Sequence, residues 1–384
     1  MVRAAAALLA AIAILAACKG NPPPVANQSP DPSTSATPSA AAIVASPTPS
    51  ASPANDLPLS RVTFSCRLPV LTTSQYQDGV TITGGFLTFP AATYQADPRG
   101  TLISRPTGDM VTGATPVLVG IPQTGPPFYD LAMKRWLPAG SGQASPDGTR
   151  YAYSVPGPSS SDPTQVHVVQ VADGSDHVVS IAPPPTGVGW QVEDFDGRSV
   201  YLAIQMVDQF PAGVWRLDVA TGLLHQLAPT SAGHVQLVQS GIAWVGLVDP
   251  ADPSPPQLPK GEPFDSLASI DLATGATTTW VYRPGQAVMF VDVDSSGHPV
   301  VMVLPPPFDH PVPMVLVSSP GNIGVAIEAP FYQLGLTEAD TGRLWFSGSK
   351  GVYYWTLATG LIKVYAFKGD PSLQQSIAPA GHCV

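Results

Sequence analysis

The segment VWRLDVATGLLHQL, residues 214–227, joins two short apolar runs through a turn that contains a glycine. Its DVATG turn recurs as DLATG at residues 271–275 and as TLATG at residues 356–360, each time between runs of the same kind. A tight hairpin turn needs a residue with positive φ, which glycine adopts without steric cost. The segment therefore predicts an antiparallel hairpin that repeats along the chain.

Two interleaved series of such turns run from about residue 140 onward, between apolar or alternating runs and without a helical period. Within each series the glycines recur at intervals of roughly 40 to 55 residues. One turn of each series per repeat gives two hairpins, or four antiparallel strands, which is the content of one β-propeller blade. The two series are Gly148, Gly197, Gly241, Gly297 and Gly342, and Gly174, Gly222, Gly275, Gly321 and Gly360.

The two ends of the repeat region are expected to close a ring of blades. Residues 374–384 have no hairpin of their own and are predicted to pair with residues 61–68. This pairing removes the strand edges that an open ring would expose. The sequence therefore predicts an all-β fold, a β-propeller of four-stranded antiparallel blades, with seven blades favoured and six as the alternative count. Two tandem β-sandwiches are the competing architecture.

One repeat carries a longer motif, ASPDGTRYAYS at residues 144–154. It resembles the SPDG blade motif of TolB-type and WD40-like propellers, in which the Asp and Gly form the turn between the innermost strand and the second strand. The full motif occurs once, and the other repeats keep only the turn. The resemblance implies the propeller fold and carries over no functional site.

The chain opens with Arg3 and an apolar run over residues 4–17, which has the pattern of a signal peptide and is too short to span a bilayer stably. The sequence LAAC at residues 15–18 resembles the lipobox of bacterial lipoproteins, in which the Cys thiol receives a lipid. We therefore expect residues 1–18 to be a lipoprotein signal peptide and Cys18 to anchor the protein to the cell envelope, outside the cytoplasm. An ordinary cleaved signal peptide is the alternative.

Residues 19–58 are rich in Pro, Ser, Ala and Thr and nearly free of aromatic residues. Such a stretch buries too little apolar surface to offset the entropy of ordering it. We predict a disordered tether over residues 19–58 and a propeller domain over residues 59–384. Proline keeps such a tether extended, at roughly 3 Å per residue.

Two cysteines remain, Cys66 near the start of the propeller region and Cys383 next to the last residue. In an exported protein such a pair predicts a disulfide, and two free thiols are the alternative. In the chain-entropy model, closing a loop of this length stabilises the fold by about 5 kcal/mol at most. The bond would fasten the same two ends that close the ring.

The charge balance argues against several classes of partner. The formal net charge is −10, only 11% of residues are charged, and no cluster of Lys or Arg occurs. Such a protein is a poor candidate for binding nucleic acid or an anionic membrane surface. We expect a monomer whose membrane contact is the lipid on Cys18.

In a four-stranded meander the glycine turns lie on one face and the remaining connections on the other. Three of those other connections are long and rich in proline, at residues 155–164, 248–266 and 304–313. Proline lowers the entropy lost on binding, and exposed aromatic residues supply contact area. The sequence predicts a partner-binding rim there, made of Phe264, Phe308 and His310, with neutral surface insertions as the alternative.

The innermost strands begin on that same face, so their first residues are predicted to surround the mouth of the central channel. Aromatic and amide groups around a concavity suit a glycan, a peptide or another small polar ligand. Packing is the alternative role for each residue. The predicted ligand-binding residues are Gln143, Trp190, His234, Gln286 and Tyr332.

Catalytic and metal-binding motifs are absent from the sequence: neither GxSxG nor HExxH occurs, and no spacing of Cys or His suggests zinc. DVDSSG at residues 292–297 resembles the opening of an EF-hand loop, but Val303 stands where the bidentate Glu belongs. Glu193, Asp194 and Asp196 form a similar cluster, and we interpret both as turn chemistry. No catalytic residue, metal or cofactor is predicted.

The leading hypothesis is a non-catalytic module, displayed at the cell envelope, that binds a protein or cell-wall partner through its loops. Capture of a small ligand or glycan at the channel mouth is the first alternative. A hydrolase-type propeller enzyme is the second.

Overall fold

The computed structural model describes residues 56–76, 79–100, 102–104, 110–112, 128–137, 139–206, 210–248, 264–305, 314–327, 335–340, 343–348, 350–369 and 374–384. All of them belong to one compact unit, Pro53–Val384. The predicted signal peptide and residues 19–55 of the predicted tether lie outside the described residues. No helix within the described ranges has the length and apolar character needed to cross a membrane.

Four sheets are complete antiparallel meanders of four strands, as the turn series predicts. The first is β11 (Gly189–Phe195), β12 (Ser199–Gln205), β13 (Ala212–Asp218) and β14 (Leu224–Ala228). The second is β15 (His234–Gln239), β16 (Ile242–Leu247), β17 (Ser266–Asp271) and β18 (Thr277–Tyr282). The third is β19 (Ala287–Val293), β20 (Pro299–Leu304), β21 (Met314–Ser319) and β22 (Asn322–Ile327). The fourth is β23 (Gly335–Asp340), β24 (Arg343–Gly348), β25 (Gly351–Thr356) and β26 (Gly360–Ala366).

The sheet before these four has a reduced innermost strand. It contains β8 (Arg150–Val155), β9 (Thr164–Gln170) and β10 (Asp176–Ile181). A single bridge from Ala144 to Tyr151 stands where the other sheets have their first strand. The SPDG turn therefore leads from this bridge into β8, as the motif predicts.

The two ends of the propeller share one sheet, which confirms the predicted closure. β27 (Gln374–Pro379) pairs with β1 (Cys66–Tyr76), which pairs in turn with β2 (Gly79–Phe89) and then β3 (Thr93–Ala96). The partner of β27 is residues 70–75 and not the predicted residues 61–68. Past β27 the chain brings Val384 opposite Arg67, with two backbone hydrogen bonds, so the predicted pairing with residues 61–68 holds for this last residue.

A disulfide joins Cys66 and Cys383, as predicted, with their Cα atoms 5.4 Å apart. It lies at the start of β1, beside the paired Arg67 and Val384. The bond therefore fastens the first strand of the propeller to the last residues of the chain.

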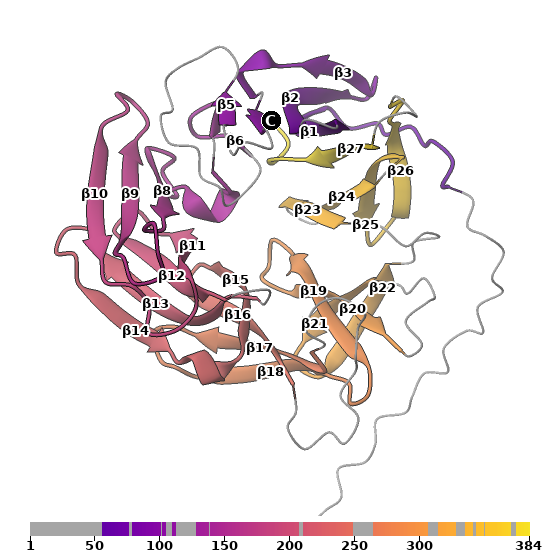
Figure 1. Ribbon diagram of the computed structural model, residues 1–384. Coiled ribbons are helices and arrows are strands. Elements are labelled where there is room, and N and C mark those ends of the chain that lie inside the picture. The colour runs from indigo at the N-terminus through magenta and orange to yellow at the C-terminus, as the bar shows by residue number, and fades with distance from the viewer. Residues whose placement is uncertain are drawn as a thin grey trace, which may run out of the picture. The chain divides into compact units, whose positions relative to one another are not determined.

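The sheets follow one another around a ring in chain order, and each contacts the next (Figure 1). A short hairpin, β6 (Phe128–Asp130) and β7 (Arg135–Leu137), lies between the closing sheet and the β8–β10 sheet. β4 (Leu102–Ser104) and β5 (Met110–Thr112) extend the closing sheet. The all-β propeller is thus confirmed. The preference for seven blades over six stays a prediction, because residues 113–127 before the hairpin lie outside the described ranges.

Nine of the ten glycines in the two predicted turn series fall in the described ranges, and all nine have positive φ, between 63° and 89°. Aspartates complete several of these turns. Asp218 Oδ1 accepts a hydrogen bond from the Thr221 backbone N–H, and Asp271 does the same for Thr274. We call the end of the strands that carries these turns the turn face, and the opposite end the loop face.

The sequence boundary of the domain needs a small correction. Residues 56–58 are predicted as tether, but Leu57 packs against the apolar cluster of Phe346 and Trp355. Asp56 accepts a hydrogen bond of 2.8 Å from the Tyr353 hydroxyl. The folded part therefore begins at or before Asp56.

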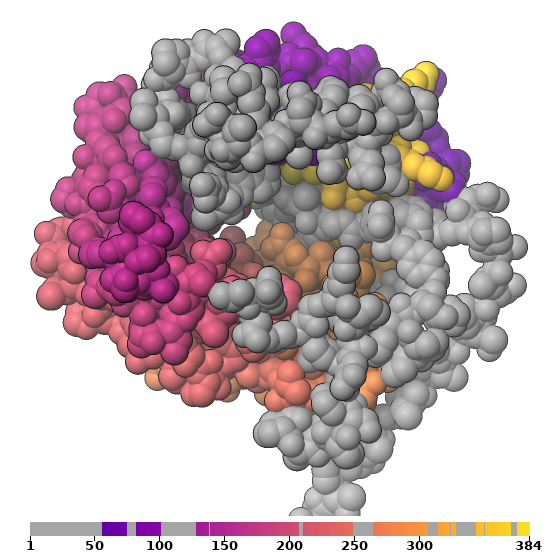
Figure 2. Space-filling model, viewed as in Figure 1, coloured from indigo at the N-terminus to yellow at the C-terminus, as the bar shows by residue number. Residues whose placement is uncertain are grey.

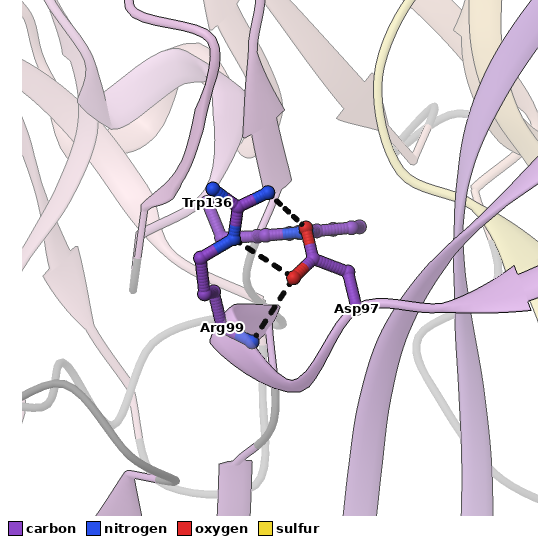
Figure 3. Close-up of polar contacts among 3 residues, drawn as sticks. All are labelled: Asp97, Arg99 and Trp136. Atoms are coloured by element: carbon purple, nitrogen blue, oxygen red, sulfur yellow. Dashed lines mark hydrogen bonds and ion pairs between the residues drawn. The ribbon is translucent and has the colours of Figure 1, made fainter.

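The hairpin β6–β7 is held to the closing sheet by a polar cluster around Asp97 (Figure 3). Asp97 accepts hydrogen bonds from Nε and Nη2 of Arg99 and, at 3.2 Å, from Nε1 of the buried Trp136. The bond from Arg99 lowers the pKa of Asp97, against the raising effect of burial. The indole packs so closely on Gly84 and Gly100 that a Cβ at either position would lie within 3 Å of the ring.

Replacing Asp97 with Asn is expected to lower the free energy of unfolding by about 2 kcal/mol, because charge-assisted hydrogen bonds from Trp136 and Arg99 are lost from a buried acceptor. Urea denaturation measures the change. Arg99→Ala is the control, since this side chain is 66% exposed and exposed ion pairs contribute about 1 kcal/mol or less. Equal losses in the two variants would show that the contact with Trp136 is not what stabilises the cluster.

Candidate functional site

The loop face of three consecutive sheets carries exposed apolar side chains. Val155 is the last residue of β8, Val188 precedes β11, Phe210 lies between β12 and β13, and Val248 follows β16. Their exposed fractions are 42%, 39%, 40% and 41%. On the turn face the exposed large apolar residues of the described ranges are Leu223 and Leu357. Exposed apolar surface concentrated on one face is a feature of interaction sites.

On the same face lies an aromatic cluster of Phe210, His234 and Phe264. The rings of Phe210 and Phe264 are 5.5 Å apart at 56°, and those of His234 and Phe264 are 5.4 Å apart at 35°. Nδ1 of His234 lies 3.4 Å from the backbone oxygen of Phe210. The cluster therefore joins the β11–β14 sheet to the β15–β18 sheet.

Phe264 is the floor of the cluster and not an exposed part of the rim, which corrects the prediction. Only 4% of it is exposed, because its ring packs on Gly246, where a Cβ would lie 2.5 Å from the ring. Its backbone oxygen accepts a 2.6 Å hydrogen bond from the Val288 N–H. Phe210 and His234 stand above this floor, half-exposed, and present the aromatic surface to solvent.

The predicted channel residues Gln143 and Trp190 are buried, which corrects their assignment as ligand contacts. Nε1 of Trp190 donates to the Ala182 oxygen at 2.8 Å, and its ring meets Trp215 edge to face at 4.9 Å. Gln143 accepts from the Gly140 N–H through Oε1 and donates from Nε2 to the Val192 oxygen. Both side chains fasten neighbouring sheets and are 3–5% exposed.

Partly exposed side chains lie next to buried ones on the innermost strands. Gln191 of β11 and Gln236 of β15 are partly exposed, and Met289 of β19 is 39% exposed. Side chains alternate between the two sides of a strand, so Gln191 is exposed where Trp190 is buried. A space-filling view shows a narrow opening beside the sheets drawn in pink and orange (Figure 2).

Of the remaining predicted residues, the structure describes Gln286. Gln286 is half-buried in the turn before β19, where its N–H donates to the Arg283 oxygen. Tyr332, Phe308 and His310 lie outside the described residues.

Three acidic residues on the innermost strands have pKa values above their ordinary range. Burial, aided by the neighbouring Asp194, raises the pKa of Glu193 to about 7. Burial likewise raises the pKa of Asp194 and of Asp292 to about 6. The Oε1 atom of Glu193 has no hydrogen-bond partner and no access to solvent. None of the described innermost strands contains Lys or Arg, so no cation offsets the burial.

The predicted interpretation of the acidic motifs as turn chemistry holds for Asp196 and Asp294. Asp196 Oδ1 accepts from the Arg198 and Ser199 N–H groups, and Asp294 Oδ1 accepts from those of Ser296 and His298. It is wrong for Glu193, which lies inside β11 at a bulge between Val192 and Asp194. Within the described part of the chain no three acidic, His or Cys side chains group as metal ligands would.

The sheet topology defines the class: the protein is a β-propeller. Among solved structures the chain is similar to the β-propeller domain of the Trilobed protease from Pyrococcus furiosus, at 14% identity over 79% of this chain and 86% of that chain, with a TM-score of 0.39. That propeller is described as having an open velcro topology, whereas here β27 pairs with β1.

Two further solved structures are similar at the level of the fold. The first is an oligogalacturonate lyase in complex with manganese, at 13% identity over 83% of this chain and 99% of that chain, with a TM-score of 0.42. The second is TolB from Acinetobacter baumannii, at 10% identity over 82% of this chain and 81% of that chain, with a TM-score of 0.34. The propeller fold that the TolB-type motif implies is shown by the sheet topology itself. No family model matches the chain, and no curated protein matches its sequence.

Proposed function

We propose that the protein is a lipid-anchored lipoprotein of the bacterial cell envelope whose propeller binds a protein or cell-wall partner, without catalysis, through its loop face. The observation that carries the proposal is the aromatic cluster of Phe210 and His234 above the buried Phe264. Aromatic residues seated in a packed support are the usual energetic centres of protein interfaces. The exposed valines around them extend the apolar surface over three sheets.

The contacts around the aromatic cluster support the proposal, because they hold its rings in place before a partner binds. Phe264 is fixed by its ring contact with Gly246 and by the hydrogen bond from Val288. Phe210 and His234 are in turn held by ring contacts with Phe264. A partner that covers these rings therefore loses little of the protein's conformational entropy on binding.

Replacing Phe210 with Ala is expected to weaken binding of the partner at least tenfold, because a half-exposed anchor of the cluster is removed. To measure binding, a photo-crosslinking residue is placed at Val248 in the full chain, with and without Phe210→Ala, and each chain is expressed in the native host. The yield of a specific crosslinked adduct reports how much partner is bound. Leu357→Ala is the matched control, since this side chain is 74% exposed on the turn face.

The lipid anchor is tested separately by the mass of the N-terminal peptide. A diacylglyceryl-modified Cys18 at the mature N-terminus is the expected species.

If Phe210→Ala and Leu357→Ala give adducts in equal yield, the loop-face site is wrong even if the anchor is found.

Partly exposed side chains of the innermost strands support a second candidate, the binding of a small polar ligand or glycan. Gln191 and Gln236 lie on neighbouring innermost strands and are both partly exposed, so their amides are placed to donate and accept hydrogen bonds. In this case Gln191→Ala, and not Phe210→Ala, abolishes binding of the ligand.

A further inference from the structure

We call the part of the predicted tether before Asp56 the stalk. The segment that follows it is bound to the outer strand of the last complete sheet. The carboxylate of Asp56 pairs with Nζ of Lys363 in β26 and accepts a 2.8 Å hydrogen bond from the Tyr353 hydroxyl of β25. The side chain of Lys363 is only 7% exposed, and that of Asp56 is 22% exposed. Nζ of Lys363 also lies 6.0 Å from the centre of the Tyr353 ring.

Three residues further on, the segment pairs with β26 through its backbone. Leu59 forms a parallel bridge with Lys363, and the Ser60 N–H donates to the Lys363 oxygen at 2.8 Å. The segment thereby satisfies polar groups on the edge of the sheet that would otherwise face solvent.

The same segment contacts three consecutive sheets. Leu57 packs in the cluster that β23–β26 shares with the β19–β22 sheet. Val62 and Phe64 pack in the cluster that β23–β26 shares with the closing sheet, where the Phe64 ring lies 5.1 Å from Tyr354 and 5.8 Å from Phe89. Residues 56–64 therefore cross the outer edge of β26 from one intersheet core to the next.

The burial of β26 shows the effect of this crossing. All seven of its residues are buried or half-buried. In the outer strands β10, β14 and β18, by contrast, the exposed residues number four of six, two of five and four of six. Because outer strands of a propeller face solvent, the covering segment accounts for the difference.

We propose that residues 56–64 are an anchoring strap that fixes where the stalk joins the propeller, at the outer edge of β26, and spreads a pull on the stalk over three sheets. The proposal rests on the lipid anchor of the proposed function. Without the strap, tension on the stalk would reach the propeller at the start of β1 alone. The Cys66–Cys383 disulfide lies directly after the strap and joins β1 to the end of the chain.

Force spectroscopy on the full chain, held through a handle at residue 19 and another at Val384, tests the strap. With the disulfide intact, only residues before Cys66 lengthen under load. Release of the ten residues 56–65 is expected as one step of at most roughly 35 Å. Asp56→Ala is expected to lower the force of that step by at least half, and Asp173→Ala, a change in a remote exposed turn, to leave it unchanged.

Hydrogen exchange on the full chain gives a second readout that does not depend on load. In Asp56→Ala the Ser60 amide is expected to exchange at least tenfold faster, while amides of β1 and β27 keep their rates. A wild-type chain with no short step, or a Ser60 amide that exchanges equally fast with and without Asp56, would overturn the strap. An N-terminal peptide without lipid overturns the anchor of the proposed function and leaves both readouts of the strap intact.

Discussion

A chain in which Cys66 and Cys383 are both replaced by Ala is expected to lose up to about 5 kcal/mol of unfolding free energy, because the disulfide closes a loop with a sequence separation of 317 residues. In the chain-entropy model the bond restricts the unfolded chain more as this loop lengthens. For a domain of this size we expect the Tm to fall by up to roughly 7 °C. Thermal and urea denaturation of the oxidised chains measure both effects.

Reduction supplies the control for this variant. Adding a thiol reductant should lower the stability of the wild-type chain to that of the double variant and leave the double variant unchanged. A wild-type chain whose stability does not respond to reductant, although the disulfide is opened, would show that the paired strands β27 and β1 close the ring without help from the bond.

The second large effect is on the pH dependence of stability, through Glu193. Its pKa is about 7 in the folded protein, against an ordinary value of 4.5. Between these values the unfolded state ionises while the folded state stays protonated, so stability falls as the pH rises. Above pH 7 the full loss, about 3 kcal/mol, is present; below pH 4.5 it is absent.

Glu193→Gln removes this penalty, so the variant is expected to be more stable than the wild type by up to about 3 kcal/mol at pH 8 and equal to it near pH 4. Urea denaturation at four or five pH values gives the difference between the two chains, in which the effects of carboxylates that do not interact with Glu193 cancel. A difference that stays constant from pH 4 to pH 8 would contradict the raised pKa.

The sequence predicts the fold well because its turns are local signals. The positive φ at Gly222 and Gly275 follows from the ATG turns alone, and the spacing of such turns gives the four-stranded sheets. The disulfide is predictable because Cys66 and Cys383 are the two cysteines outside the predicted lipobox. These features need no knowledge of how the sheets pack on one another.

The candidate site is harder to predict because it depends on packing between sheets. Trp190 is predicted to line the channel, but a strand places successive side chains on opposite sides, and the exposed position belongs to Gln191. Phe264 is buried because Gly246, on a neighbouring strand, leaves room for its ring. Phe210 carries no sequence signal of its own, and only the contact with Phe264 identifies it.

The strap was missed for a related reason. Asp56 stands at the end of a proline-rich stretch and reads as part of a tether. Its partner, Lys363, lies 307 residues away, and nothing near either residue in the sequence predicts the pairing. A contact between residues so far apart in the sequence can be identified only from the folded structure.

Peptide mass spectrometry of a non-reduced digest, prepared from protein taken directly from the cell envelope, tests the closed ring most directly. The expected result is one linked pair of peptides, joined through Cys66 and Cys383. Recovery of the two peptides unlinked, or of either one joined to Cys18, would contradict the disulfide that fastens the two ends of the ring.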